Sequence, residues 1–117
     1  MRKKVMAAVL TAAMVASVSA MPQMVAAADD EFKIGLITDV GGVNDGSFNQ
    51  SAWEGLEKAG EELGVEVNYL ESATDADYQP NMETFVDEDY DLIISVGYML
   101  ADATREAAEA NPDTKFA

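Results

Sequence analysis

The segment DLIISVG, residues 91–97, decides the fold class because its apolar residues follow one another instead of alternating with polar ones. A strand with one solvated face alternates apolar and polar residues, whereas a strand covered by helices on both faces is apolar throughout. We therefore expect residues 91–97 to be a central strand of a parallel sheet, with helices over both of its faces.

Other apolar runs of strand length lie on both sides of this segment, and helical patterns separate them. The expected strands are FKIGLITD (residues 32–39), VEVNYLES (65–72), DLIISVG (91–97) and the start of a fourth in KFA (115–117). The expected helices run from Ser47 to Leu63, from about Pro80 to Val86, and through MLADATREAAEANP (99–112). Strands that alternate with helices predict an α/β fold in which right-handed crossovers make neighbouring strands parallel.

The first expected helix carries signals at both ends. SFNQ, residues 47–50, has the form of a capping box, in which Ser47 accepts a hydrogen bond from a free helix amide and Gln50 reaches back. Gly64 is typical of the residue that ends a helix. Between these ends, a stripe of apolar and small residues recurs at helical spacing: Ala52, Trp53, Leu56, Ala59, Gly60 and Leu63.

Residues 1–28 are expected to be a cleaved signal peptide. The basic start MRKK precedes an apolar run, residues 5–18, that is shorter than the roughly 20 residues of a membrane span. Small residues offer cleavage after Ala20 or after Ala28, and the second is preferred because acidic DDEF follows it. An uncleaved membrane anchor is the alternative. With cleavage, residues 29–117 would be exported to the periplasm or the exterior.

Charge and composition narrow the classes of partner and chemistry. Residues 29–117 hold all 22 acidic residues of the chain but only four of its seven basic ones, which gives a formal charge of −18. Such a surface would repel nucleic acids and anionic membranes, so we expect neither as a partner. The 117 residues include no cysteine and no histidine, which excludes disulfides, thiol or histidine catalysis and the common zinc sites within them.

The glycine-rich stretch TDVGGVNDGSFNQSAWEG, residues 38–55, is not a typical phosphate loop. Gly41 and Gly46 have the P-loop spacing, but Ser47 and Phe48 stand where that motif requires Lys and then Ser or Thr. The dinucleotide pattern GxGxxG is also missing from this stretch.

A calcium loop is also not supported. Asp87, Asp89 and Asp91 begin with the spacing of an EF-hand. However, Leu92 replaces the required glycine, and Tyr98 stands where the bidentate glutamate belongs. We therefore expect neither a metal ion nor a cofactor.

A ligand site is expected at the carboxyl ends of the strands, where open parallel sheets bind their ligands. The residues that meet at this edge are Asp39, Phe48, Asn49, Gly97, Tyr98 and Met99. Asp39 can accept a pair of hydrogen bonds, and the ring of Phe48 can cover a flat ligand, which suits an uncharged molecule with hydroxyl or N–H donors. Alternatively, Phe48 belongs to the core, because it shares a helical stripe with Ala52 and Leu56.

Three segments resemble the basic membrane protein family of ABC-transporter solute-binding proteins, which includes the purine nucleoside receptor A lipoproteins. They are KIGLITDVGGVNDGSFNQSAWEGL (residues 33–56), YLESATDADYQPNMETFVDEDYDLIISVGYMLADA (69–103) and NPDTKFA (111–117). The resemblance covers residues 32–117 and implies two α/β lobes of the type I periplasmic-binding-protein class, with the ligand between them. Residues 29–117 would be the first part of the N-terminal lobe only.

The resemblance also implies a function and a role for each residue at the sheet edge. The protein would not be an enzyme; it would bind nucleosides, with purine nucleosides favoured, and pass them to a membrane permease driven by a separate ATPase. Asp39 would bond the nucleobase, Phe48 would stack on it and Asn49 would help to orient it. Residues 97–99, Gly97, Tyr98 and Met99, would line the cleft, and the protein is expected to be a monomer.

Two departures from the family pattern modify these expectations. Many members carry a lipobox cysteine at the end of the leader, and this chain has none, so a freely secreted or periplasmic protein is expected. Without the second lobe, residues 29–117 alone should bind nucleosides very weakly or not at all. The alternatives are a sensing or signalling member of the same fold, and an exported hydrolase that uses Asp39 and Asp45 as paired carboxylates.

Overall fold

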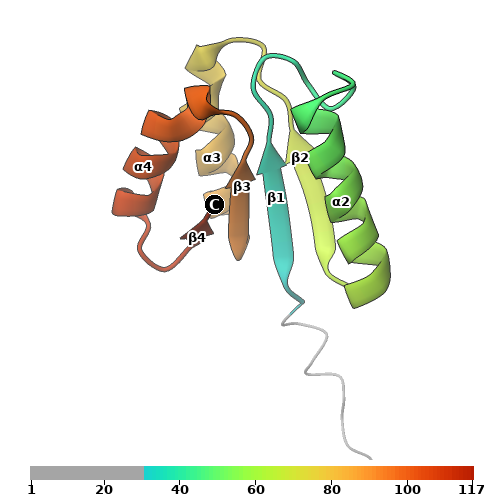
Figure 1. Ribbon diagram of the computed structural model, residues 1–117. Helices are drawn as coiled ribbons and strands as arrows, with labels where there is room; N and C mark the ends of the chain where they lie inside the picture. The colour runs from blue at the N-terminus through green and yellow to red at the C-terminus, as the bar shows by residue number, and fades with distance from the viewer. Residues whose placement is uncertain (1–30) are drawn as a thin grey trace, which may run out of the picture.

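The computed structural model describes residues 31–117, which form a four-stranded parallel sheet with helices on both faces (Figure 1). The strands are β1 (Lys33–Ile37), β2 (Glu66–Leu70), β3 (Leu92–Ser95) and β4 (Lys115–Phe116), and their order in the sheet is β2-β1-β3-β4. All three pairings are parallel, and Ile34 lies opposite Val67 on one side and Leu92 on the other. The predicted α/β fold is confirmed, while the expected signal peptide, residues 1–28, lies outside the described residues.

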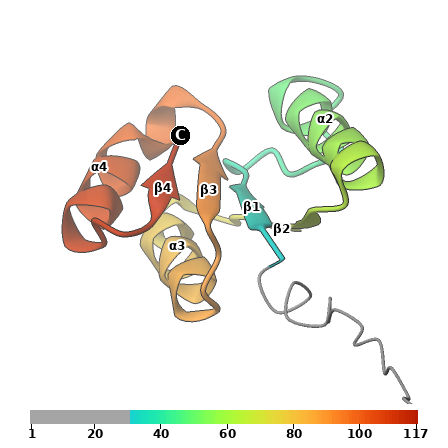
Figure 2. The ribbon, with the colours of Figure 1, turned by 90° about the horizontal axis from the view of Figure 1, so that it is seen from below.

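The helices follow the predicted order and divide between the two faces of the sheet. Helix α2 (Phe48–Leu63) lies on one face and α3 (Tyr78–Asp87) on the other, with α4 (Ala101–Ala110) beside α3 (Figure 2). Two 3-10 turns, η1 (Asp75–Asp77) and η2 (Tyr98–Leu100), lead into α3 and α4. Right-handed crossovers explain this division. The chain moves from β1 to β2 in one direction and then back past β1 to β3 in the other, so α2 and α3 lie on opposite faces of the sheet.

Strand β1 is buried on both faces because its alternate residues enter two apolar clusters. Ile34 and Leu36 pack with Val43 and Leu56 on the α2 side of the sheet. Ile37 enters the cluster on the α3 and α4 side, which also contains Tyr78, Met82, Phe85, Tyr90, Ile93, Leu100 and Ala107. Strand β1 is therefore held in place by packing on both faces of the sheet.

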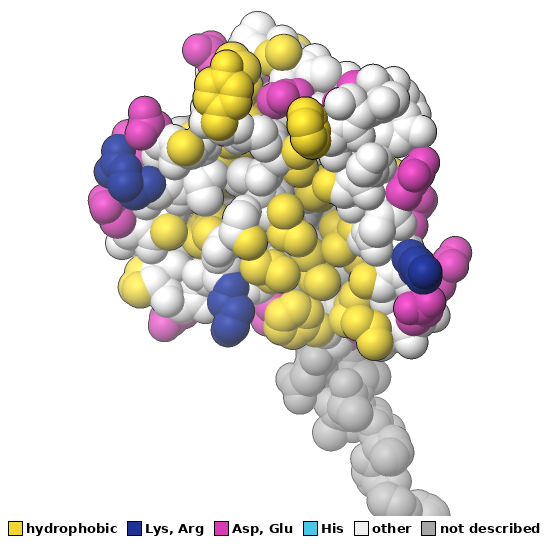
Figure 3. All heavy atoms as spheres, in the orientation of Figure 1, with side chains coloured by type: hydrophobic (Ala, Val, Ile, Leu, Met, Phe, Trp, Pro, Cys, Tyr) yellow, Lys and Arg dark blue, Asp and Glu magenta, His cyan; other side chains and the backbone are white. Residues whose placement is uncertain are grey.

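Strand β3 is a central strand, as predicted, but one of its two faces is only partly covered. Ile93 is fully buried on the α3 side, but Leu92 and Ile94 on the α2 side are only half-buried. Apolar side chains gather over β1 and β3 at the centre of this face (Figure 3). The reason is that α2 packs over β2 and β1, and no other helix of residues 31–117 covers that side of β3.

The predicted capping box at the start of α2 is wrong in its partners. The side chain of Ser47 makes no capping hydrogen bond. The carboxylate of Asp45 instead accepts hydrogen bonds from the backbone N–H groups of Ser47, Asn49 and Gln50 at 2.8, 3.2 and 3.0 Å. Gln50 does reach back, but its Oε1 accepts from Gly46 N–H at 2.9 Å. A charged acceptor near the positive end of a helix is stronger than a hydroxyl, which explains why Asp45 takes this role.

The other helix ends show smaller differences from the prediction. Gly64 ends α2 in the left-handed conformation, as predicted, with φ of +76°. Leu63, however, is 74% exposed and does not belong to the packed stripe. Helix α3 starts two residues before Pro80, because a capping box formed by Thr74 and Asp77 organises the turn η1 that leads into it.

Candidate functional site

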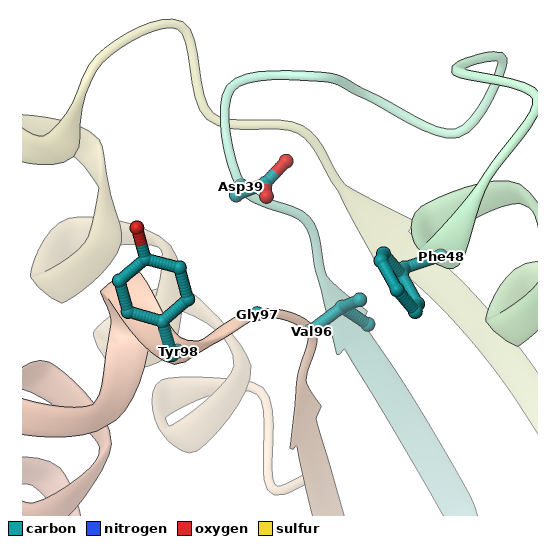
Figure 4. A pocket seen from close by; sticks show the side chains of 5 residues that line it. All are labelled: Asp39, Phe48, Val96, Gly97 and Tyr98. Atoms are coloured by element: carbon teal, nitrogen blue, oxygen red, sulfur yellow. The ribbon is translucent and has the colours of Figure 1, made fainter.

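A pocket of about 450 Å³ lies at the carboxyl ends of β1 and β3, where the sequence predicts a ligand site. Its lining residues are Asp39, Phe48, Val96, Gly97 and Tyr98. Phe48 and Tyr98 stand on opposite sides of the pocket, with Asp39 between them (Figure 4). The sheet brings these segments together, because β1 and β3 are neighbours and Val96 N–H donates to the carbonyl oxygen of Ile37 at 3.0 Å.

Asp39 has one carboxylate oxygen that is bonded within the protein and one that is free to meet a ligand. Oδ1 accepts hydrogen bonds from Gly41 N–H at 2.8 Å and from Nδ2 of Asn49 at 2.7 Å. Oδ2 makes no hydrogen bond with residues 31–117 and lies beside Gly97, where a Cβ atom would be 3.1 Å from it. Asp39 can therefore accept from a ligand chiefly through Oδ2.

Asn49 does not line the pocket, although the family resemblance implies a contact with the nucleobase. Its side chain is 1% exposed and lies behind Asp39, where Nδ2 bridges Asp39 Oδ1 and Asp45 Oδ2 at 2.7 and 2.9 Å. Its own Oδ1 is buried and has no hydrogen-bond partner among the described residues. In this arrangement, Asn49 holds the carboxylate that faces the pocket.

The two aromatic walls of the pocket are open to solvent. Phe48 is 80% exposed and Tyr98 is 89% exposed, so the alternative in which Phe48 packs in the core is wrong. Phe48 is exposed as the first residue of α2, whereas Leu56 of the same helix is buried. Exposed aromatic rings beside a concave surface offer faces on which a flat ligand can stack.

The floor of the pocket consists of two residues that follow β3. Gly97 has φ of +104° and ψ of 144°, a conformation that is open essentially to glycine alone. Val96 lies directly before Gly97 and was missed by the sequence analysis. It is an apolar residue at the end of an apolar strand, and nothing in the sequence shows whether such a residue lines a pocket or belongs to the core. Met99 was predicted to line the cleft, but it is half-exposed and lies outside the lining of this pocket.

The glycine-rich loop between β1 and α2 turns above the sheet edge and is held from below by Glu71. Glu71 Oε2 accepts a hydrogen bond from Val43 N–H at 2.8 Å. Gly42 has φ of +72°, and a Cβ atom there would lie 2.6 Å from the same oxygen. Gly42 thus allows both the turn of the loop and the close approach of Glu71. This structural role agrees with the absence of a phosphate-binding lysine from the loop.

Two groups around Asp39 have perturbed pKa values. Desolvation alone would raise the pKa of Asp45, but hydrogen bonds from the backbone N–H groups of Ser47, Gln50 and Asn49 and from the Asn49 side chain hold it below its ordinary value. Burial, followed by the negative charges of Asp39 and Asp75, raises the pKa of the Tyr78 hydroxyl. Asp45 is thus an ionised capping group outside the pocket lining, an arrangement that does not favour the hydrolase alternative.

One of the acidic positions considered for calcium has another hydrogen-bond partner. Asp91 Oδ2 accepts a hydrogen bond from Lys33 N–H at 2.8 Å. Within residues 31–117, no three His, Cys, Asp or Glu side chains are grouped so that they could hold a metal ion. None of the helices in this described part combines the length and apolar character needed to cross a membrane.

Comparison with known proteins assigns this chain to a family. Residues 32–117 match the model of a family described as ABC transporter substrate-binding protein PnrA-like. The chain is 49% identical over 92 residues to the CD4+ T-cell-stimulating antigen of Listeria monocytogenes, and 41% identical over 90 residues to the ABC transporter nucleoside-binding protein BmpA of Lactococcus lactis. Each alignment covers 74% of this chain and 26% of the relative.

A solved structure supports the same relationship. The chain resembles an ABC transporter solute-binding protein from Aeropyrum pernix with a TM-score of 0.66 and 31% sequence identity. That match covers 73% of this chain and 23% of the solved chain. The chain thus spans about a quarter of the length of the relatives it matches.

Proposed function

We propose, from the premise that this chain belongs to the PnrA-like family of ABC transporter substrate-binding proteins, that it forms one side of a nucleoside-binding cleft. The family is described as one of ABC transporter substrate-binding proteins, so this protein would bind a small molecule and would not be an enzyme. Residues 29–117 would form the first part of the N-terminal lobe, and a second lobe would close over the ligand. Nucleosides of the purine type are the favoured ligands.

The observation that carries this proposal is the free Oδ2 of Asp39 between two exposed aromatic rings. A nucleobase presents two flat faces and N–H groups at its edge. Phe48 could stack on one face while Asp39 Oδ2 accepts from the edge, and Tyr98 would border the pocket on the far side. The nucleoside-binding relative from Lactococcus lactis supports this choice of ligand.

The proposed place of the protein follows from the transporter family. It would lie outside the cytoplasmic membrane and deliver the nucleoside to a permease that a separate ATPase drives. The predicted signal peptide supports an exported location, and the formal charge of −18 for residues 29–117 supports a partner other than nucleic acid. We expect the binding protein to act as a monomer without a cofactor.

A hybrid protein tests the ligand class. In this hybrid protein, residues 32–117 replace the aligned segment of the Lactococcus lactis relative, so that a complete second lobe faces them. Thermal unfolding is then measured with nucleosides, free bases, sugars and amino acids. A ligand at 100 times its Kd stabilises the bound protein by about 2.7 kcal/mol, which is enough to raise Tm measurably. Nucleosides should raise Tm, and a shift produced only by sugars or amino acids would contradict the proposal.

Substitutions in the hybrid protein test the assigned residues. Phe48→Ala and Asp39→Ala should each weaken nucleoside binding at least about tenfold, since each removes a stacking face or a charged acceptor. Leu63→Ala is the matched control, because Leu63 is also an exposed apolar residue of α2 but lies at the opposite end of the helix. Equal affinity in the Phe48, Asp39 and Leu63 variants would refute the assignment of the site.

A further inference from the structure

We propose that Asp45, acting through Asn49, is a positioning residue that fixes the carboxylate of Asp39 at the mouth of the pocket. Asp45 does not line the pocket and would not touch a ligand there. It belongs to the loop before α2, whereas Asp39 ends β1, so the connection ties the first turn of the helix to the end of the strand. The consequence for binding rests on the proposed function, but the geometry can be tested without any ligand.

The two oxygens of Asp45 are fully used by groups from the start of α2. Oδ1 accepts from Ser47 N–H at 2.8 Å and from Gln50 N–H at 3.0 Å. Oδ2 accepts from the backbone N–H of Asn49 at 3.2 Å and from its side-chain Nδ2 at 2.9 Å. Because these contacts come from several directions, Asp45 fixes both the backbone and the side-chain amide of Asn49.

Asn49 then transmits this orientation to Asp39. Its Nδ2 has two N–H donors, one for Asp45 Oδ2 and one for Asp39 Oδ1 at 2.7 Å. Asn49 is 1% exposed, so water has little access to replace these partners. Flipping the amide would place Oδ1 against two carboxylates, so only the orientation with Nδ2 toward both is favourable.

The arrangement also decides which oxygen of Asp39 is left for a ligand. Gly41 N–H and Asn49 Nδ2 occupy Oδ1, and Oδ2 remains beside Gly97. Without the Asn49 contact, only Gly41 N–H would hold Oδ1, and the carboxylate would rotate more easily. The bridge from Asp45 therefore keeps Oδ2 aimed at the pocket before a ligand arrives, and such preorganisation reduces the cost of binding.

Nuclear magnetic resonance of the full chain tests this connection. Asp45→Asn retains an amide oxygen that can cap the helix, but it places an NH2 group opposite Asn49 Nδ2, which then loses one of its two acceptors. Hydrogen exchange of the Asn49 side-chain amide should become about tenfold faster. The 13Cγ signal of Asp39 should shift as well, although Asp39 itself is unchanged.

Two further variants separate positioning from general destabilisation. Asn49→Ala leaves the bonds from Ser47 and Gln50 to Asp45 in place, and it should still shift the Asp39 13Cγ signal, which keeps the test decisive if Asp45→Asn does not fold. Asp77→Asn is the matched control, because Asp77 caps η1 through Ala73 and Thr74 N–H without touching Asp39.

The possible results distinguish a failure of this proposal from a failure of the proposed function. The connection would be supported if the Asp39 13Cγ signal moves in both Asp45→Asn and Asn49→Ala, the Asn49 amide signal changes in Asp45→Asn, and neither signal moves in Asp77→Asn. Unmoved signals in Asn49→Ala, or equal shifts in the Asp77 control, would overturn it. A hybrid protein that ignores nucleosides would refute the proposed function and would leave this result unaffected.

Discussion

A side chain at position 97 would crowd the carboxylate of Asp39. A Cβ at position 97 would lie 3.1 Å from Asp39 Oδ2, and the backbone there has φ of +104°. Gly97→Ala should therefore cost about 1–3 kcal/mol of unfolding free energy, measured by urea denaturation, and should displace the Asp39 carboxylate. Gly46→Ala is the control, since Gly46 has φ of +66° with open space around it. An unchanged Asp39 13Cγ signal in Gly97→Ala would contradict this account of the pocket.

The sequence predicts which residues reach the sheet edge better than it predicts how their side chains lie. Asp39, Phe48, Gly97 and Tyr98 line one pocket, as their positions after the strands suggest. Spacing could not decide whether Phe48 is buried, because a residue in the first turn of a helix can turn either way. The burial of Asn49 was also beyond sequence reasoning, since it depends on two carboxylates from the loop and the strand.

At the scale of elements, α3 packs closely on the sheet because β1 has a glycine at its centre. A Cβ at Gly35 would lie 2.6 Å from Cδ2 of Phe85, whose ring is buried against the strand. We expect Gly35→Ala to destabilise the chain by about 1–3 kcal/mol, the usual cost of overpacking. The measurement is chemical denaturation with circular dichroism.

In the same denaturation experiment, we expect Gly55→Ala to have the opposite effect on stability. Gly55 is exposed in the middle of α2, and a Cβ there meets nothing within 4 Å. The substitution should stabilise α2 by up to about 1 kcal/mol, because alanine is a better helix former than glycine. Destabilisation of similar size by both substitutions would show that the contact with Phe85 does not set the cost at position 35.

The first residue of α3 carries a buried hydroxyl that finds no partner among the described residues. Tyr78 is 3% exposed, and its hydroxyl makes no hydrogen bond there. Tyr78→Phe should therefore leave stability unchanged or raise it by about 1 kcal/mol. Tyr90→Phe is the matched control and should destabilise, because the Tyr90 hydroxyl accepts from Asn68 at 2.7 Å and donates to Glu66 at 3.3 Å.

The pH dependence gives an independent check on Tyr78. Its pKa is raised in the folded chain, first by burial and then by Asp39 and Asp75, so the native state keeps a proton that the unfolded state loses above about pH 10. Stability should fall as the pH rises through this range. The fall should be less steep in Tyr78→Phe when urea unfolding is followed from pH 8 to 11, and an identical slope would contradict the assignment.

The capping of α2 shows where element prediction fails for a physical reason. Ser47 and Asp45 both lie close enough to the free amides, and the sequence pattern favours Ser47. The ionised Asp45 takes these hydrogen bonds because its two oxygens can serve several N–H groups at once. The capping-box pattern considers the residue at the cap position, Ser47. It does not test whether Asp45, two residues earlier, binds the same N–H groups more strongly.

At the scale of the whole molecule, the fold class and strand direction could be predicted from alternation alone. The coverage of β3 could not, because it depends on where α2 crosses the sheet. The half-buried side of β3 and the open pocket both leave apolar side chains partly exposed.

The chain alone should be a poor receptor. Phe48 and Tyr98 are exposed at 80% and 89%, so a nucleoside on this surface would keep much of its own area in water. Since binding sites bury most of their ligand, residues 29–117 should bind nucleosides with a Kd of roughly 1 mM or weaker in isothermal titration. Nanomolar affinity of the isolated chain would contradict the assignment of a shared cleft.

The Kd of a purine nucleoside for the hybrid protein tests the central claim most directly. If residues 32–117 form one side of a nucleoside cleft, a folded hybrid protein should bind within about tenfold of the affinity of the Lactococcus lactis relative, a difference of about 1.4 kcal/mol. A folded hybrid protein that binds no nucleoside, under conditions in which the relative does, would contradict the claim.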